Sequence, residues 1–351
     1  MGLREEYRVS HPDFPWLSAS DPGPVAALLA RNGWLEPGEQ VRAVAKAGEG
    51  NMNLSLRVDT DRRSVVLKQA RPWVEKYDMI AAPWDRSLHE QRFYQRVRDL
   101  AKVASRMPRL LGADAQAHAL LLEFCPGASD LSSVYAGDRL TRDELETLAD
   151  YLAALHRGTR GQPEPDFANV EMRRLNHEHI YRLPLAGVPG MDLERFEPGL
   201  TAAAQALRED PAYVEAVHRT GERYLGAGPS LLHGDYFPGS WLRTDPGLRV
   251  IDPEFCFYGD PEFDLGCVAA HLALSGHART DWDAFANAYR SSTVRMLDTA
   301  LTARFAGAEV MRRLLGVAQL PIPPSTDRRR AHLLERSRTA VLDGNAGSLW
   351  R

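Results

Sequence analysis

One stretch decides the fold of this chain: LLHGDYFPGSWLRTDPGLRVIDPEFCFYGDPEFDLG, residues 231–266. An apolar run delivers Asp235 into a loop, and Ser240 stands five residues further along. A second short apolar segment ends at Asp252, and Glu254 follows two residues later. Acidic side chains therefore follow two short apolar segments, each at a point where the chain leaves regular structure.

The chemistry that such a set suits is phosphoryl transfer. One carboxylate must accept or orient the proton of an attacking hydroxyl, and others must hold Mg²⁺ against nucleotide phosphates. Asp235 is the candidate for the first role. Asp252 and Glu254 are candidates for the second, because Mg²⁺ is often held by one or two carboxylates plus phosphates. Taken singly, Asp235 could cap a loop and Asp252 could sit in a turn, so it is the whole ordered set that favours catalysis.

The composition indicates the class of protein. The chain has 351 residues, 44% hydrophobic and 26% charged, so it is globular and long enough for about two domains or lobes. A net charge of −4 argues against a nucleic-acid binder. Three cysteines are too few for a disulfide framework and fit a reducing cytoplasm. No stretch reaches about 18 uninterrupted apolar residues, so we expect no membrane span.

The first third of the sequence has strand character. Five short segments between polar turns are predicted as strands, the first three as an antiparallel meander: 40–46, 53–59, 64–70, 108–112 and 119–124. A short amphipathic helix is predicted at 24–35 and another helix at 87–100. For the second helix, Ser87 is the predicted cap, and Glu90 stands at the capping-box spacing.

Beyond residue 126 the pattern becomes helical. Thr141 and Glu144 have the capping-box spacing, and the sequence after them keeps a 3.6-residue period. Helices are predicted to continue through 190–225 and 281–345. The predicted fold class is α+β with two lobes. They are a small antiparallel-sheet lobe, residues 1–126, and a larger helical lobe, residues 127–351.

The ordered pattern HGDxxxxS…IDPEF…FDLG resembles that of the aminoglycoside phosphotransferase superfamily, small-molecule kinases with a protein-kinase-like fold. Among them it is most similar to the bacterial 5-methylthioribose kinases, which share the loop HGD…GS and the segment VIDPEFxFYG. Common superfamily members have Asn at the position of Ser240 and a lone Asp where this chain has Asp252 and Glu254. The methylthioribose kinases share both departures. The resemblance implies ATP and Mg²⁺ as cofactors, Asp235 as the catalytic residue, and Asp252, Glu254 and Ser240 as metal ligands.

The resemblance extends to a nucleotide-binding segment in the first lobe. GEGNMNLSLRV, residues 48–58, is similar to the family's nucleotide-covering loop and second strand, although a glycine-bearing hairpin can also be a plain turn. The resemblance implies that Lys68 grips the α- and β-phosphates and that Glu90 orients it. LLLEF, residues 120–124, looks like the hinge strand, which contacts adenine through its backbone. The implied nucleotide-binding residues are Gly48, Gly50, Asn51, Asn53, Lys68, Glu90, Glu123 and Phe124.

Two further segments of the resemblance concern the phosphate acceptor. Trp73 and Trp84 lie where these kinases have a Trp-bearing loop near the substrate, but both rings could instead pack a long connection. MRRLLGVAQ, residues 311–319, resembles a helix whose arginines reach the sugar. Arg312 and Arg313 point in different directions on a helix, so at most one is expected to contact substrate, and both could lie on the surface.

Three residues beside these motifs are expected to be structural. The resemblance implies that Asp264 in EFDLG holds the catalytic loop through backbone hydrogen bonds. His233 is expected to orient that loop rather than to act as a base. Cys256 lies on an apolar segment and is expected in the core.

Together these observations predict transfer of the γ-phosphate of ATP to a hydroxyl. The first choice of acceptor is 5-methylthioribose, which gives a 1-phosphate of methionine salvage. Phe237, where the family pattern often has His, and Pro238 leave other acceptors open: an aminoglycoside, a choline-like compound or another sugar. A catalytically silent nucleotide-binding protein is a further hypothesis, against which the intact acidic residues and Lys68 argue. We expect no nucleic-acid or membrane partner, and the resemblance implies a homodimer.

Overall fold

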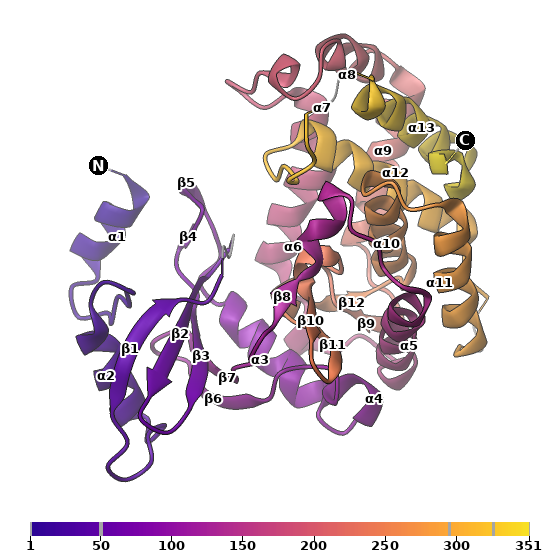
Figure 1. The fold of residues 1–351 in the computed structure, drawn as a ribbon. Coiled ribbons are helices and arrows are strands. Elements are labelled where there is room, and N and C mark those ends of the chain that lie inside the picture. The colour runs from indigo at the N-terminus through magenta and orange to yellow at the C-terminus, as the bar shows by residue number, and fades with distance from the viewer. Residues whose placement is uncertain (1, 49–51, 294–295, 325–326, 351) are drawn as a thin grey trace. The chain divides into compact units, whose positions relative to one another are not determined.

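The chain divides into two compact units. The computed structural model describes residues 2–48, 52–293, 296–324 and 327–350. The first unit contains Met1–Asp99 and Met107–Gly127, and the second contains Leu100–Arg106 and Ala128–Arg351. The first unit carries a five-stranded antiparallel sheet, and the second is mainly helical (Figure 1). The predicted α+β fold, with a small antiparallel-sheet lobe and a larger helical lobe, is confirmed.

The sheet of the first unit has the strand order β1-β2-β3-β7-β6, with every neighbouring pair antiparallel. Leu67 pairs with Leu56 on one side and with Leu121 on the other, so one buried row of leucines crosses three strands. Leu28 and Leu29 of α2 (Pro22–Arg31) belong to the same core cluster. The strands are β1 (Val41–Lys46), β2 (Leu54–Thr60), β3 (Ser64–Gln69), β6 (Leu110–Asp114) and β7 (Ala119–Glu123).

Three further pieces complete the first unit. The helix α1 (Leu3–Ser10) contacts the strand β5 (Tyr77–Ala81), which pairs with β4 (Trp73–Val74). The helix α3 (Arg86–Val97) contacts β6 and β7. These pieces set the surroundings of the candidate phosphate-binding lysine on β3.

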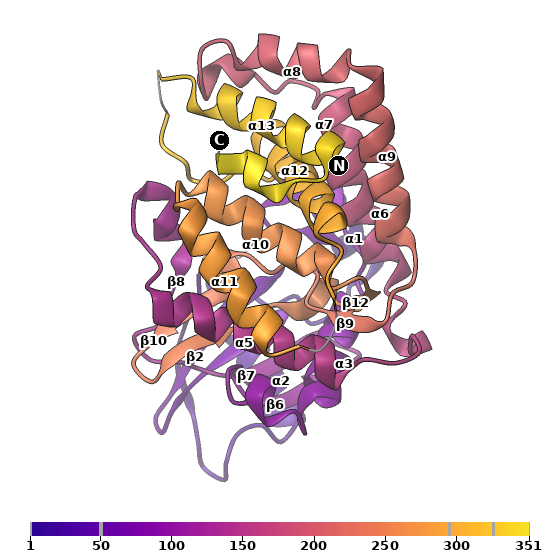
Figure 2. The same ribbon diagram turned by 90° about the vertical axis from the view of Figure 1, so that its right-hand side faces the viewer.

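The second unit is built around α12 (Thr299–Leu315), which packs against both α10 (Glu262–Leu274) and α13 (Arg329–Asp343). Figure 2 shows these helices together with α11 (Arg279–Ser291). The other helices are α4 (Ala101–Ala104), α5 (Arg142–Gly158), α6 (Val170–His177), α7 (Leu183–Ala186), α8 (Leu200–Arg208) and α9 (Pro211–Leu225). Because α12 has neighbours on opposite sides, almost its whole length is buried.

Two small antiparallel sheets in the second unit position the loops of the predicted site. One pairs β9 (Ser230–Leu232) with β12 (Phe257–Gly259). The other has the order β11-β10-β8 and comprises β8 (Ser129–Asp130), β10 (Trp241–Thr244) and β11 (Gly247–Val250). The chain leaves β9 into the loop that contains Asp235, and it leaves β11 toward Asp252.

The first turns of α5 and α3 test the two helix caps that the sequence predicts. Thr141 and Glu144 form the predicted capping box of α5, in which each side chain bonds the backbone of the other residue. The helix predicted at 87–100 is present as α3, but its predicted cap is wrong, because Ser87 lies inside the helix and Asp85 occupies the cap position without a side-chain cap bond. Glu90 contacts Lys68 instead. In the part of the chain that the structure describes, no helix is both long and apolar enough to cross a membrane.

Candidate active site

The loop that follows β9 is held by the buried carboxylate of Asp264. The amides of His233 and Gly234 donate hydrogen bonds to the two oxygens of Asp264, over 2.8 and 3.0 Å. His233 Nε2 lies 2.9 Å from the carbonyl oxygen of Ile251. Gly234 has φ of +85°, and a Cβ there would lie 2.2 Å from the Phe255 carbonyl oxygen. The loop therefore requires glycine, and Asp264 holds it through backbone hydrogen bonds, as the sequence predicts.

Asp264 is itself fixed within the second unit. It lies in the first turn of α10 and is fully buried. His156 on α5 places Nε2 3.1 Å from Asp264 Oδ2, while its Nδ1 lies 2.9 Å from the hydroxyl of Tyr289 on α11. Three helices thus determine the position of the loop that presents Asp235.

Asp235 is the carboxylate that this loop presents. About a fifth of its side chain, 22%, is exposed, and Oδ1 lies 3.4 Å from Nη2 of Arg313. Burial raises the pKa of Asp235 above its usual value, although the guanidinium groups of Arg313 and Arg312 act in the opposite direction. A carboxylate with a raised pKa that stays partly accessible is suited to accept a proton from a hydroxyl group.

The candidate metal ligands lie on adjoining segments. Ser240 Oγ donates to the carbonyl oxygen of Asp235 over 2.9 Å, and the amide of Ile251 donates to the carbonyl of Ser240 over 3.0 Å. The residue after Ile251 is Asp252, which has φ of +63° and begins the tight turn that carries Glu254. The hydroxyl hydrogen of Ser240 is thus used to hold the loop that presents Asp235.

The backbone around Glu254 is held by Asn169, whose Nδ2 lies 2.9 Å from the carbonyl oxygens of Glu254 and Cys256. Cys256 is fully buried, as expected for a core residue. Among the described residues, no group of three or more His, Cys, Asp or Glu side chains is placed to hold a metal ion. Two carboxylates with phosphate oxygens as further ligands are nevertheless a donor set that suits Mg²⁺.

Both arginines predicted near the acceptor are buried, so the surface alternative is wrong. Arg312 and Arg313 occupy the last turn of α12, and both bind Glu309 on the preceding turn. Arg313 Nε lies 2.6 Å from Glu309 Oε1, and Arg312 Nη1 lies 3.0 Å from Glu309 Oε2. Arg313 is the one of the two that also reaches Asp235.

In the first unit, Lys68 and Glu90 form a buried ion pair. Lys68 Nζ on β3 lies 2.6 Å from Oε2 of Glu90 on α3, and both side chains are at most 5% exposed. Burying two charges is costly unless they are closely paired, so this contact fixes α3 against the sheet. The structure thus brings together the lysine and the glutamate that the resemblance assigns to phosphate binding.

The predicted nucleotide-covering loop is described only in part. Gly50 and Asn51 lie outside the described residues. At Gly48 an added Cβ would meet no atom within 4 Å, so the space there does not require glycine. Asn53 is buried and accepts a hydrogen bond of 2.8 Å from Arg86 Nε.

Arg86 is a central residue that the sequence reasoning missed. Its side chain is fully buried at the start of α3. Besides Asn53, it donates to the carbonyl oxygens of Met52 over 2.8 Å and of Arg71 over 2.6 Å. It therefore joins the exit of the covering loop to the segment after β3. An arginine in the first turn of a helix gives little signal in the sequence, because that position usually favours acidic residues on a solvent face.

The predicted hinge strand is β7. The amide of Glu123 donates to the carbonyl oxygen of Arg109 over 2.9 Å, so this N–H group is used within the unit. Glu123 Oε2 also accepts from the amide of Arg109 over 3.1 Å. The ring of Phe124 lies 4.6 Å from the guanidinium of Arg57.

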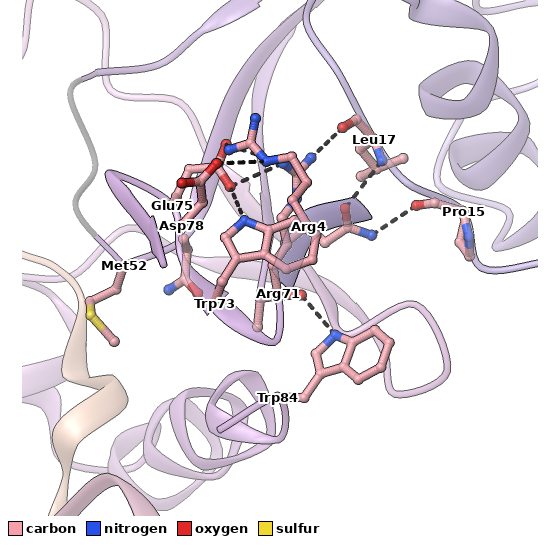
Figure 3. A network of polar contacts seen from close by, with 12 residues as sticks. Arg4, Pro15, Leu17, Met52, Arg71, Trp73, Glu75, Asp78 and Trp84 are labelled. Atoms are coloured by element: carbon pink, nitrogen blue, oxygen red, sulfur yellow. Dashed lines mark hydrogen bonds and ion pairs between the residues drawn. The ribbon is translucent and has the colours of Figure 1, made fainter. Parts of the chain in front are cut away.

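The two predicted tryptophans belong to an aromatic cluster of the first unit. Trp73 is fully buried and stacks on Trp16, with ring centroids 5.3 Å apart. Its Nε1 donates to Glu75 over 3.2 Å (Figure 3). Trp84 stacks on Trp16 at 5.8 Å and donates to the carbonyl of Ala70. The expectation that Trp73 contacts substrate is therefore corrected, because residues of the N-terminal segment cover its ring. Trp84 remains partly exposed.

Charged groups on α1 and on the segment after β3 surround the aromatic cluster. Arg71 and Arg4 both bind Glu75, and Arg4 also lies 3.5 Å from Asp78 (Figure 3). The guanidinium groups of Arg4 and Arg71 lie 5.7 and 5.8 Å from the ring of Trp73. These contacts anchor α1 to the β4–β5 hairpin, so the packing alternative describes this segment.

The chain is similar to known proteins in both sequence and fold. The sequence model of the phosphotransferase enzyme family matches residues 43–335. Methylthioribose kinase from Exiguobacterium sibiricum is 25% identical over 360 aligned residues, which cover 88% of this chain and 88% of that protein. Methylthioribose kinase from a Geobacillus species is 24% identical over 359 residues, covering 89% and 86%. The structure of choline kinase LicA from Streptococcus pneumoniae matches with a TM-score of 0.54 at 16% identity, over 91% of this chain and 98% of that one. This last likeness is one of fold.

Proposed function

Because the chain belongs to the phosphotransferase enzyme family, we propose that it transfers the γ-phosphate of ATP to the 1-hydroxyl of 5-methylthioribose. Membership makes it a small-molecule kinase that acts on a hydroxyl group. The choice of acceptor rests on one observation. The alignment to methylthioribose kinases runs over most of both chains, and this chain keeps Ser240 and the Asp252-x-Glu254 pair that set those kinases apart in the resemblance.

Asp235 carries the chemical step in this proposal. The acceptor hydroxyl gives its proton to the carboxylate, its oxygen forms a bond to the γ-phosphorus, and the bond to the ADP oxygen breaks. The raised pKa of Asp235 favours proton uptake, while the nearby Arg313 keeps the carboxylate from being protonated too readily. The hold of Asp264 on the loop fixes where the carboxylate stands.

The remaining groups bind the nucleotide and the acceptor in this proposal. Lys68, oriented by Glu90, contacts the phosphates, and the first unit, Met1–Asp99 with Met107–Gly127, is the nucleotide-binding lobe. Asp252, Glu254 and Ser240 hold Mg²⁺, which when bound neutralises charge on the phosphates. Of Arg312 and Arg313 on α12, it is Arg313 that binds an acceptor oxygen, and its 3.4 Å contact with Asp235 supports this role.

The first experiment measures ADP formation by the purified chain with ATP and Mg²⁺. The acceptors are methylthioribose, ribose, an aminoglycoside and choline. Fast turnover with methylthioribose alone is the expected result. Turnover with a different acceptor, and none with methylthioribose, would contradict the proposed specificity and keep the phosphoryl-transfer chemistry.

Asp235→Asn tests the catalytic assignment. We expect turnover to fall by about 10²–10⁴-fold, the usual contribution of a general base, with ATP affinity unchanged. Asp245→Asn, on the exposed turn between β10 and β11, is the matched control and should keep full turnover. Equal turnover of the two variants would remove Asp235 from the mechanism.

A cytoplasmic location and a homodimer stay predictions, which fractionation and sedimentation can test.

A further inference from the structure

A carboxylate that the proposed mechanism does not use lies one helical turn before the two arginines. Glu309 is 2% exposed, and its two oxygens accept hydrogen bonds from the guanidinium groups of both Arg312 and Arg313. Its distances to Arg312 are 3.2 and 3.0 Å, and its distance to Arg313 is 2.6 Å. Residues three and four apart lie on the same face of a helix, so this geometry is built into α12 itself.

Arg313 is held from three sides. Glu309 receives its Nε, Asp235 lies 3.4 Å from its Nη2, and the ring of Phe237 lies 4.6 Å from the guanidinium carbon. A guanidinium over an aromatic face is attracted by the ring quadrupole. The shortest of these contacts is the one to Glu309, and it leaves the far edge of the guanidinium directed at Asp235.

Glu309 is in turn fixed by α10. His271 Nε2 lies 3.2 Å from Glu309 Oε1, and His271 Nδ1 lies 2.5 Å from the hydroxyl of Tyr135. Burial lowers the pKa of His271 to about 4, so the ring is neutral at pH 7. A carboxylate can only accept, so Nε2 carries the hydrogen and Nδ1 accepts from the tyrosine. The ring of Phe237 lies 5.2 Å from that of His271, which closes the arrangement.

We propose that Glu309 is a positioning residue for phosphoryl transfer, which holds Arg313 against Asp235 before an acceptor is bound. This inference rests on the proposed function, because it assumes that Asp235 receives the acceptor hydroxyl. Glu309 contacts Asp235 through Arg313, so its effect on the reaction passes through the arginine. An error of about 1 Å in such a group lowers turnover by about 10²-fold.

The test compares Glu309→Gln with a matched buried carboxylate. Glu197 is 1% exposed and accepts from the amides of Arg330 and Ala331 at the start of α13, a helix that the proposed mechanism does not use. We expect Glu309→Gln to lower kcat by about 10²-fold with ATP affinity unchanged. Glu197→Gln should lower the melting temperature and keep kcat. Glu309→Asp keeps the charge but withdraws it by one methylene, so it should also lower kcat.

A double-mutant cycle with Arg313→Gln separates positioning from general stability. If Glu309 acts through Arg313, the double variant Glu309→Gln/Arg313→Gln should have the kcat of Arg313→Gln alone. Multiplicative losses in the cycle, or a folded Glu309→Gln variant with the kcat of the parent chain, would overturn the proposal.

A spectroscopic measurement keeps the inference independent of the acceptor. The arginine Nε–H resonance of Arg313 should exchange slowly with solvent in the parent chain and in Asp235→Asn, and rapidly in Glu309→Gln. Rapid exchange in the parent chain would overturn the positioning role. Failure of the parent chain to phosphorylate methylthioribose would instead count against the proposed function, and this resonance distinguishes the two outcomes.

Discussion

The two units bury their charged groups in different ways. In the first unit, Lys68 on β3 pairs with Glu90 on α3, so the two charges come from different elements. In the second unit, Glu309 binds two arginines from the same end of the same helix, and Asp235 joins them from a loop at 3.4 Å. The first contact forms when a strand and a helix dock. The second is prearranged by one helix.

This difference shows how each unit can fix a functional charge. Lys68 contacts a glutamate on a different element, so its position depends on how α3 packs against the sheet. Arg313 has Glu309 as a close partner and Asp235 as a more distant one. The arginine can therefore keep its place while the contact to Asp235 changes during a reaction.

The largest expected effect breaks the pair in the first unit. Lys68→Met removes the cation that lies 2.6 Å from the buried carboxylate of Glu90, so we expect a loss of about 3–5 kcal/mol in the free energy of unfolding, measured by urea denaturation. Turnover should fall as well, because the proposed phosphate contact is removed. Lys68→Met/Glu90→Leu should recover much of the stability and none of the turnover.

The control for this prediction is an exposed pair. Arg142 and Glu146 on α5 lie 2.8 Å apart, with 72% and 46% of their side chains exposed. Arg142→Met should change stability by less than about 1 kcal/mol. A Lys68→Met variant as stable as Arg142→Met would show that the buried pair does not fix α3.

The next largest effect is the loss of folding stability at acidic pH that arises from a histidine of the second unit. An unfolded histidine binds a proton below pH about 6.5, whereas His271 in the folded chain does so only below pH about 4. Between these values the unfolded state holds one proton more, so stability falls as the pH falls, by about 3 kcal/mol in total. Glu309, whose pKa lies below its usual value, contributes its own loss only at the acid end of this window.

His271→Gln tests this assignment by urea denaturation between pH 7 and 4.5. Glutamine does not titrate, so the variant should lose less stability on acidification than the parent chain. His332→Gln, at an exposed position on α13, should follow the parent chain. Parallel curves for all three proteins would show that the acid sensitivity arises elsewhere.

The smallest expected effect concerns the contact between Arg313 and the ring of Phe237. Phe237→Leu removes the aromatic face and keeps an apolar side chain, which should cost about 1 kcal/mol in transition-state stabilisation, measured as kcat/KM for the acceptor. Phe196→Leu is the matched control, since Phe196 lies 5.8 Å from the guanidinium of Arg330 on α13. Equal kcat/KM values for the two variants would show that the ring of Phe237 does not position Arg313.

The sequence predicted those features that are local or carried by a continuous motif. The capping box at Thr141 needs only residues three apart, and the hold of Asp264 on the loop follows a short motif. The Ser87 cap failed because Glu90, which would have completed the box, contacts Lys68 instead. Tertiary packing thus overrode a correct local spacing.

The roles that the sequence did not reveal depend on packing between elements that are remote in the sequence. Trp73 is covered by Trp16, whose position no local pattern reveals. Glu309 stands at helical spacing from Arg312 and Arg313, which usually indicates a solvated ion pair. Its burial follows from the packing of α10 and α13 around α12, and this can be seen only in the fold.

The short segment of residues 100–106 affects how this protein can be synthesised and divided. It belongs to the second unit, where Val103 is fully buried, Leu100 fills the space beside Gly158, and the carbonyl of Arg106 accepts from the amide of Val250. A ribosome makes this segment before β7 completes the first sheet, and its partners emerge only later. A single cut after residue 127 would leave this segment on the fragment that contains the first unit, apart from its partners in the second unit. Any split or permuted form of the chain must therefore return α4 to the later half.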